Sequence, residues 1–236
     1  MWWFLVAVCI LIFLKSPKVK GWLGEICVKI VLGKTKPGMK YVINNLLLNV
    51  GENKTSQIDH VLINANGIFV IETKNYSGRI YGCADDFEWT QVLRYGKVKN
   101  KFYNPIKQNK THVYHISKII NQDIPLTSAV VFVRGNTRFV NAIGVYNLFG
   151  LKRLISSNTK TDLTPEQMLE AYELIIGAKD TSTSQAEHIN NIRSLRNDID
   201  NNICPRCGKR LIIRNGKNGS FYGCEGYPQC RFTKRI

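Results

Sequence analysis

The segment that most constrains the fold is residues 57–75, where two apolar, β-branched runs flank Asn66-Gly67. That dipeptide between such runs is the strongest short-range signal for a β-hairpin. A two-residue turn at Asn66-Gly67 places Asp59 opposite Lys74. Because opposed residues point to the same side of a sheet and side chains alternate along a strand, Asp59, Glu72 and Lys74 are predicted to share one face.

Two carboxylates and an ammonium group on one face suit metal-assisted hydrolysis of a phosphodiester. We expect Asp59 and Glu72, completed by the carbonyl of Thr73, to hold catalytic Mg²⁺ or Mn²⁺, which prefer hard oxygen ligands. Lys74 then positions the attacking water or stabilises charge in the transition state. The alternative is a surface salt bridge between Glu72 and Lys74. The strands are apolar on both faces, where isolated charges are costly, and this favours the catalytic interpretation.

The chain is strongly basic, with 33 Lys and Arg residues against 17 Asp and Glu. The excess indicates a polyanionic partner, either nucleic acid or the anionic face of a membrane, rather than a charge that serves solubility alone. Between Arg94 and Lys110 there are six basic residues and no acid, interleaved with Tyr95, Phe102 and Tyr103. Such a mixture suits phosphate contacts and base stacking. The four histidines are dispersed. His112 and His115 lie three apart on one helical face, where metal binding is one alternative, but we expect them to be solvated or to contact phosphate.

Residues 2–14 form a continuous apolar run that begins with two tryptophans and is followed by Lys15, Lys18 and Lys20. A helix of this length covers roughly 20 Å, short of the ~30 Å hydrocarbon core, and snorkelling lysines close part of the gap. A buried helix of a soluble domain is the alternative. The aromatic end and the lysines favour a single-pass anchor in the cytoplasmic membrane, with the rest of the chain in the cytoplasm.

Four cysteines near the C-terminus have the spacing of a tetrahedral zinc site: Cys204, Cys207, Cys224 and Cys230. So few residues cannot build a sufficient core, so structural Zn²⁺ must supply the stability of this module. The remaining cysteines show no disulfide framework, which indicates a reducing compartment.

Four short motifs together resemble the nuclease-related domain, NERD, over roughly residues 20–130. They are Gly21-Trp22-Leu23-Gly24-Glu25, Gln57-Ile58-Asp59-His60, Ile71-Glu72-Thr73-Lys74-Asn75 and Asn104-Pro105-Ile106-Lys107-Gln108-Asn109. The resemblance implies an α/β fold of the restriction-endonuclease-like superfamily, with a mixed central sheet flanked by helices and the hairpin at its centre. It also implies Glu25 as a third acidic group, Gln108 as a polar group reaching the site from the next helix, and a homodimer.

The stretch from Cys204 to Cys230 resembles the zinc-ribbon repeats of type IA DNA topoisomerases, which bind DNA that is largely single-stranded. The likeness implies contacts to DNA from Arg206, Lys209, Arg210, Arg214, Phe221, Tyr222 and Tyr227. It does not imply topoisomerase activity, because the domain with the catalytic tyrosine has no counterpart in this chain.

The expected organisation is an anchor at 1–18, a nuclease-like domain at 20–178, a linker at 179–202 and a zinc ribbon at 203–236. Within the second part we expect helices over 21–32, 104–121 and 164–177, and strands over 41–50, 126–133, 142–145 and 152–155. The function that follows is a membrane-tethered, metal-dependent nuclease acting on DNA. The alternatives are an inactive protein that tethers DNA at the membrane, and a ribbon that binds protein.

Overall fold

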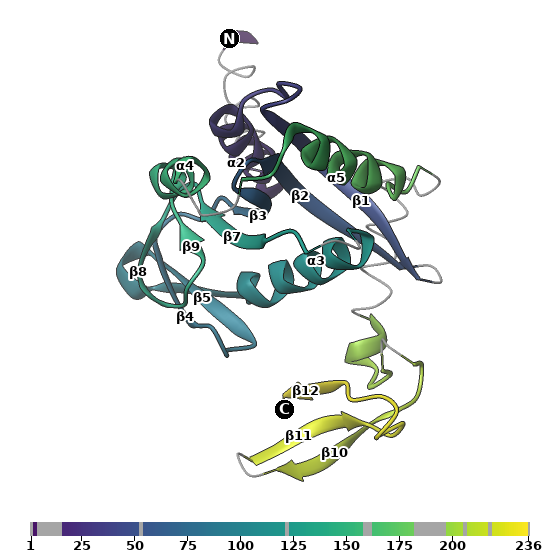
Figure 1. Cartoon of the computed structure of the whole chain (residues 1–236). Coiled ribbons are helices and arrows are strands. Elements are labelled where there is room, and N and C mark those ends of the chain that lie inside the picture. The colour runs from purple at the N-terminus through teal and green to yellow at the C-terminus, as the bar shows by residue number, and fades with distance from the viewer. Residues whose placement is uncertain are drawn as a thin grey trace. The chain divides into compact units, whose positions relative to one another are not determined.

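The computed structural model describes residues 2–3, 16–51, 54–120, 123–157, 162–181, 197–204, 207–216 and 219–235. The chain divides into two compact units. The first comprises residues 1–50 and 56–179, and the second comprises 180–236 with the short segment 51–55. Figure 1 shows the helices and strands of both units.

The first unit is a mixed α/β structure built on a five-stranded sheet in the order β1-β2-β3-β7-β9. Its strands are β1 (Lys40–Gly51), β2 (Lys54–Asn64), β3 (Gly67–Lys74), β7 (Leu126–Phe132) and β9 (Val145–Tyr146). The pairing of β2 with β3 is antiparallel, whereas β3–β7 and β7–β9 are parallel. The predicted mixed sheet is therefore present, and the β2–β3 hairpin lies in its interior.

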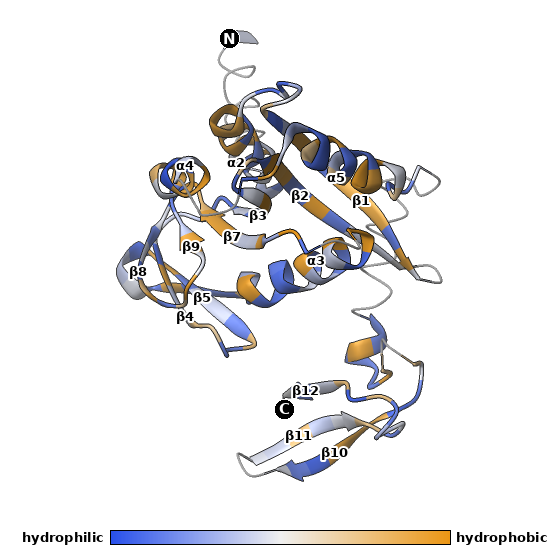
Figure 2. Cartoon of the chain, in the orientation of Figure 1, coloured by the Kyte–Doolittle hydropathy of each residue, from blue (hydrophilic) through white to orange (hydrophobic). Residues whose placement is uncertain are grey.

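Helices cover both faces of this sheet. On one face, α2 (Pro17–Leu32) and α4 (Leu148–Ser156) pack on residues such as Leu62, Phe69 and Ile71. On the other face, α3 (Pro105–Ile119) and α5 (Pro165–Gly177) pack on Val61 and Val70. Figure 2 shows hydrophobic residues concentrated along β1, β2 and β7, between these layers. The two helical layers, one on each face of the sheet, thus explain why the central strands are apolar on both faces.

The register of the β2–β3 hairpin differs from the prediction by two residues. Asn64 pairs with Gly67, so the turn is Ala65-Asn66 and Gly67 is the first residue of β3. Gly67 has a φ of 115°, and a Cβ there would lie 2.7 Å from the carbonyl oxygen of Pro125. The glycine is therefore needed where β3 passes the chain entering β7. A shift of two residues preserves the face on which each side chain lies, so the predicted grouping survives.

A second, four-stranded sheet in the order β6-β5-β4-β8 completes the first unit. Its strands are β4 (Arg79–Cys83), β5 (Glu88–Leu93), β6 (Val98–Tyr103) and β8 (Asn136–Asn141), and the 3₁₀ turn η1 (Arg94–Gly96) joins β5 to β6. Buried Trp89 and Ile80 on its inner face pack against Val130 and Phe132 of β7. The sequence predicted short strands here but not a separate sheet.

The expected strand at 152–155 was wrong, because these residues lie in α4. The side chain of Asn147 caps that helix by accepting a hydrogen bond from the amide of Gly150, 2.7 Å away. The predicted helix after Thr164 is confirmed as α5, with a capping box between Thr164 and Gln167. The capping box that begins at Thr164 is visible in the sequence and predicts α5. The cap at Asn147 is not part of such a box, and α4 was therefore not predicted.

Among the described residues, no helix has the length and apolar character needed to cross a membrane. Most of the predicted anchor at 1–18 falls on residues 1 and 4–15, which lie outside the described residues, whereas Pro17 and Lys18 already belong to α2. Trp2 and Trp3, at its outer end, are described and are both highly exposed.

The second unit contains a three-stranded antiparallel sheet of β10 (Leu211–Gly216), β11 (Gly219–Cys224) and β12 (Thr233–Arg235). Its small core consists of Leu211 with Cys204, Cys224 and Cys230. Most of the predicted linker, residues 182–196, lies outside the described residues. A core that is mainly cysteine supports a fold that depends on metal.

Candidate nuclease site and zinc ribbon

The carboxyl end of β3 carries a buried ion pair. The Nζ of Lys74 lies 2.7 Å from Oε1 of Glu72, and only 17% of the Lys74 side chain and 3% of the Glu72 side chain are exposed. Glu72 and Lys74 are two residues apart in one strand, so both point to the face covered by α3. The pair is therefore held inside the first unit rather than in bulk solvent.

Helix α3 supplies the next group of the site. The amide oxygen of Gln108 accepts a second hydrogen bond from Lys74, at 3.1 Å. Asn109, the following residue, is completely buried and donates to the carbonyl of Val70 and to the hydroxyl of Ser128, both at 2.8 Å. Asn109 thus fixes α3 on the sheet, and this attachment aims Gln108 at the lysine.

Asp59 joins the site from β2. Its Oδ2 accepts a hydrogen bond from the backbone amide of Thr73 at 2.7 Å, which places the carboxyl between Glu72 and Lys74 along the neighbouring strand. Burial and the charge of Glu72 raise the pKa of Asp59 well above its usual value. The hydrogen bond from the amide of Thr73 and the charge of Lys74 lower this pKa, but by less. The buried carboxyl group of Glu72 and the partly buried one of Asp59 therefore oppose each other at this point.

The second carboxyl group behaves differently. Burial alone would raise the pKa of Glu72, but Lys74 and His112 outweigh burial and lower it. Its Oε1 is bound to Lys74, whereas Oε2 accepts no hydrogen bond from a described residue. Glu72 is thus the acid of the pair whose pKa is lowered, and its Oε2 makes only a longer contact, to His112.

His112 belongs to this site, and sequence reasoning missed it. It is 6% exposed, its Nε2 lies 3.4 Å from Oε2 of Glu72, and its Nδ1 lies 2.9 Å from the hydroxyl of Ser56. The expectation of a solvated or phosphate-binding histidine was therefore wrong for His112. The available signal was its position four residues after Gln108, because residues at that spacing share one face of a helix.

Glu25 approaches the site from α2. The preceding residue, Gly24, packs so tightly on Asn75 that a Cβ would lie 2.7 Å from the Cβ of Asn75. Asn75 also donates to the carbonyl of Lys20 at 2.6 Å. Glu25 is half-buried, and burial together with the charge of Glu72 raises its pKa. The helix is therefore attached to the end of β3 that carries the buried ion pair.

The donor set at this end of the sheet fits a divalent cation. Asp59 and Glu72 provide buried carboxylate oxygens, and their mutual repulsion is the condition that a cation relieves. Hard oxygen donors of this kind suit Mg²⁺ or Mn²⁺. Within the described ranges, Glu25 is not close enough to both to make a three-carboxylate cluster. The site therefore offers two carboxylates rather than three.

The second unit brings the four cysteines together as predicted. Their sulfur atoms lie within 4.8 Å of one another, with Cys204–Cys230 at 3.6 Å and Cys207–Cys224 at 3.3 Å. A tetrahedral site with sulfur ~2.3 Å from zinc has edges of about 3.8 Å. The backbone amide of Lys209 and then the Cys224 thiol lower the pKa of Cys207 to about 7, which favours a thiolate. The geometry and the donors fit Zn²⁺.

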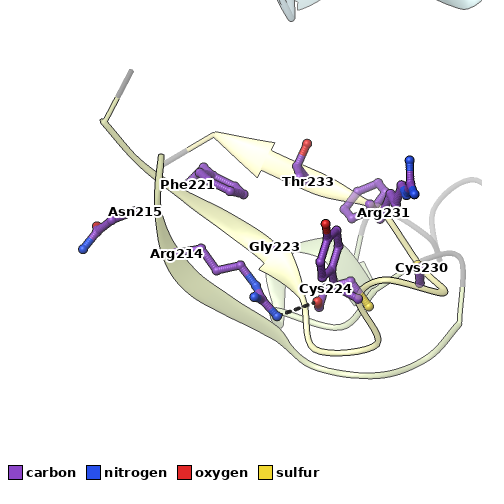
Figure 3. Close-up of a pocket in the computed structure, with 10 residues that line it drawn as sticks. Arg214, Asn215, Phe221, Gly223, Cys224, Cys230, Arg231 and Thr233 are labelled. Carbon is purple, nitrogen blue, oxygen red and sulfur yellow. Dashed lines mark hydrogen bonds between the residues drawn. The ribbon is translucent and has the colours of Figure 1, made fainter. Parts of the chain in front are cut away.

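The residues predicted to contact DNA lie on different faces of the ribbon. Arg214, Phe221 and Tyr227 line a hollow of about 570 Å³. Figure 3 shows Arg214 reaching along the sheet to the carbonyl of Cys224, with Phe221 on the neighbouring strand. Tyr222 alternates to the opposite face, where Lys234 lies over its ring and the cysteine core packs against it.

The other predicted DNA contacts are distributed outside this hollow. Lys209 and Arg210 are exposed on the segment that leads into β10. Arg206 lies outside the described residues. The three lining residues combine one cation with two aromatic rings, and Arg214 lies over the ring of Tyr227 at 5.7 Å.

Comparisons with known proteins match both units. The family model of the nuclease-related domain matches residues 20–133, and that of the topoisomerase DNA binding C4 zinc finger matches residues 201–236. An uncharacterized protein of Bacillus anthracis is 34% identical over 204 residues, covering 79% of this chain and 94% of that protein. DNA topoisomerase 1 of Methanocaldococcus jannaschii is 49% identical over 37 residues, covering 16% of this chain and 5% of the topoisomerase. No solved structure matches the chain.

Proposed function

The chain belongs to the nuclease-related domain (NERD) family, and on that premise we propose that it is a metal-dependent nuclease that hydrolyses phosphodiester bonds of DNA. The observation that carries the proposal is the buried hydrogen-bonded chain Glu72–Lys74–Gln108 beside the carboxyl of Asp59. A structural ion pair does not need a second buried carboxyl group next to it, because the added charge costs free energy. A cation bound at this position would explain how the two acids can lie side by side.

Asp59 and Glu72, with the carbonyl of Thr73, would hold Mg²⁺ or Mn²⁺. When bound, the ion supplies Lewis-acid polarisation of the phosphate and lowers the pKa of a water molecule. The raised pKa of Asp59 supports this assignment, since a cation offsets the repulsion between the two groups, and Oε2 of Glu72 has only the longer contact to His112.

Lys74 acts as a cation in this scheme. Burial alone would lower its pKa, but the charge and hydrogen bond of Glu72, and then Asp59, outweigh burial and raise it. The ammonium therefore persists at neutral pH, so it orients the attacking water or stabilises negative charge on the phosphate rather than removing a proton. Gln108 holds the ammonium in place, and Glu25 assists at the edge of the site.

The zinc ribbon is proposed to hold the nucleic acid. Phe221 and Tyr227 offer ring faces, Arg214 offers a cation, and the hollow between them is open enough to receive bases. Stacking on rings combined with phosphate contacts favours single-stranded DNA. Zinc stabilises this unit and takes no part in hydrolysis.

Residues 2–14 are proposed to tether the protein to the cytoplasmic face of the membrane. The support is their continuous apolar character, the exposed Trp2 and Trp3, and the lysines that follow. With this orientation both units work in the cytoplasm. A homodimer remains a prediction that derives from the resemblance to the superfamily.

Replacing Lys74 with alanine tests the proposed role of the lysine. We expect Lys74→Ala to reduce cleavage of labelled DNA in Mg²⁺ by at least about a hundredfold, because one charge-stabilising group in a buried site is worth several kcal/mol. DNA affinity measured in EDTA should change less than about twofold. Lys118→Ala, which changes an exposed lysine on α3 outside the basic stretch 94–110, is the control. Equal loss of cleavage and binding in Lys74→Ala would contradict the assigned role.

A further inference from the structure

The outer face of the β6-β5-β4-β8 sheet has a surface that the proposed mechanism does not use. Trp89 and Ile80 point inward from β5 and β4, so their neighbours Thr90 and Tyr81 point outward. The register places Lys101 opposite Thr90, and Phe139 opposite Tyr81, on this same side. We call this set of outward residues of the four strands the outer face.

Two aromatic rings stack against each other on the outer face, and a third is exposed nearby. Tyr81 and Phe139 stack with ring centroids 4.7 Å apart and planes 18° from parallel. Phe139 remains 45% exposed, and Tyr103 at the end of β6 is 44% exposed. Tyr81 and Arg79 both lie against the ring of Phe139, so the Tyr81–Phe139 pair is an apolar support of the face rather than a free stacking surface.

Cations surround these rings. Arg79 lies over the ring of Phe139 at 5.9 Å, and Lys99 and Lys101 are exposed on β6. Glu88 is the only acid among the outward residues of these four described strands, and it pairs with Lys101 at 3.7 Å. Asp85 and Asp86 lie in the β4–β5 turn, at the end of the sheet away from η1. The end of the face next to η1 is therefore the positive one.

The turn at that positive end has an unusual backbone. Arg94 and Tyr95 both have positive φ values, 49° and 56°, which are costly for residues with a Cβ. The conformation leaves the Tyr95 side chain fully exposed at the tip, next to Lys97. A hollow of about 250 Å³ lies between this tip and Arg79. The strained turn thus extends the outer face with another ring and two more cations.

We propose that the outer face, together with the Tyr95 turn, binds single-stranded nucleic acid and leads it to the nuclease site. The fully exposed ring of Tyr95 offers π-faces to an unpaired base, which a duplex keeps stacked internally. Only residues 75–78 separate Lys74 of the site from Arg79 of the face. The guiding role rests on the proposed function, whereas binding itself is measured without catalysis.

The first test measures the phosphate contacts. The double variant Lys99→Glu/Lys101→Glu, in the full chain and in EDTA, should bind a fluorescent oligo-dT about tenfold or more weakly than the wild type. The slope of log affinity against log salt should also fall by about 1.4, at ~0.7 per lost contact with single-stranded DNA. The control is Lys34→Glu/Lys36→Glu, which makes the same charge change at two exposed lysines. Equal behaviour of the two variants would overturn the proposal.

The second test measures stacking on the face. Oligo-dT carrying 4-thiothymidine should photocrosslink to the peptide that contains Tyr95 in the wild-type full chain. Tyr95→Leu keeps an apolar side chain but removes the ring, and should abolish that crosslink, whereas Tyr95→Phe should retain it. Crosslinks confined to the zinc ribbon would overturn the proposal. So would a Lys99→Glu/Lys101→Glu variant that loses only its binding to anionic vesicles, since the partner would then be lipid.

These tests separate the outer face from the nuclease assignment. If the face binds DNA but no metal supports cleavage, the binding proposal stands and the proposed function fails. If cleavage of single-stranded DNA is metal-dependent but unaffected by Lys99→Glu/Lys101→Glu at subsaturating DNA, the nuclease stands and the guiding role fails.

Discussion

At the residue scale, the site is a set of buried charges whose pairings decide their states. Asp59, Glu72 and Lys74 could be grouped from the sequence because alternation along a strand is strict. The contact of His112 with Glu72 could not be grouped in this way, since it depends on how α3 docks on the sheet. That docking is set by buried hydrogen bonds of Asn109, so the spacing from Gln108 could put His112 on the same helix face but could not place it against Glu72.

His60, beside Asp59 but on the opposite side of the strand, predicts a pH dependence of stability. Its Nδ1 pairs with Oδ1 of Asn44 at 2.8 Å, its Nε2 is buried without a described partner, and burial lowers its pKa to about 4. The unfolded chain, with a pKa near 6.5, binds more protons between pH 6.5 and 4. Stability therefore falls as pH falls through this window, by up to about 3 kcal/mol, and this loss is complete below pH 4.

Urea denaturation at pH 7 and pH 4.5 checks this expectation. The wild-type free energy of unfolding should fall more between these values than that of His60→Gln, which has no titrating group at this position. The comparison isolates the histidine, since Asp59 and Glu72 contribute to both proteins. An equal fall in the two proteins would show that His60 takes up its proton without penalty.

At the element scale, the central hairpin and the helices with recognisable caps followed from local rules. The turn was displaced because Gly67 serves the approach to Pro125, and a contact to a segment nearly sixty residues away has no local signature. The predicted strand at 152–155 is part of helix α4. Its apolar run is short, and short apolar runs do not distinguish a helix from a strand. The separate β6-β5-β4-β8 sheet depends on the parallel pairing of β4 with β8, which is equally non-local.

At the scale of the whole molecule, the net charge of +16 includes the cations of the two surfaces that we propose bind nucleic acid. The ribbon hollow and the outer face each combine exposed rings with cations. The two units were foreseeable from the cysteine spacing and the length of the chain, because a Cys₄ module folds around its own metal. The membrane segment rests on composition and orientation rules alone.

Tethering is checked by flotation of the full chain with phospholipid vesicles. Ile10→Arg places a charge within the apolar run, at a cost of roughly 3 kcal/mol in a membrane helix, and should shift most of the protein to the soluble fraction. Ile30→Arg, at an isoleucine that is exposed on α2, should float like the wild type. Flotation of Ile10→Arg at the wild-type level would argue against an anchor in residues 2–14.

The central claim is that the buried acids hold a catalytic metal. The most direct measurement is cleavage of labelled single- and double-stranded DNA by the full chain, titrated with Mg²⁺ or Mn²⁺ and stopped with EDTA, beside Asp59→Asn. Asn keeps the size of the side chain and removes its charge. We expect cleavage by the wild type to require added metal and cleavage by Asp59→Asn to be lost. The two proteins should bind DNA with equal affinity in EDTA. Cleavage that persists in Asp59→Asn, or DNA binding without cleavage in either metal, would contradict it.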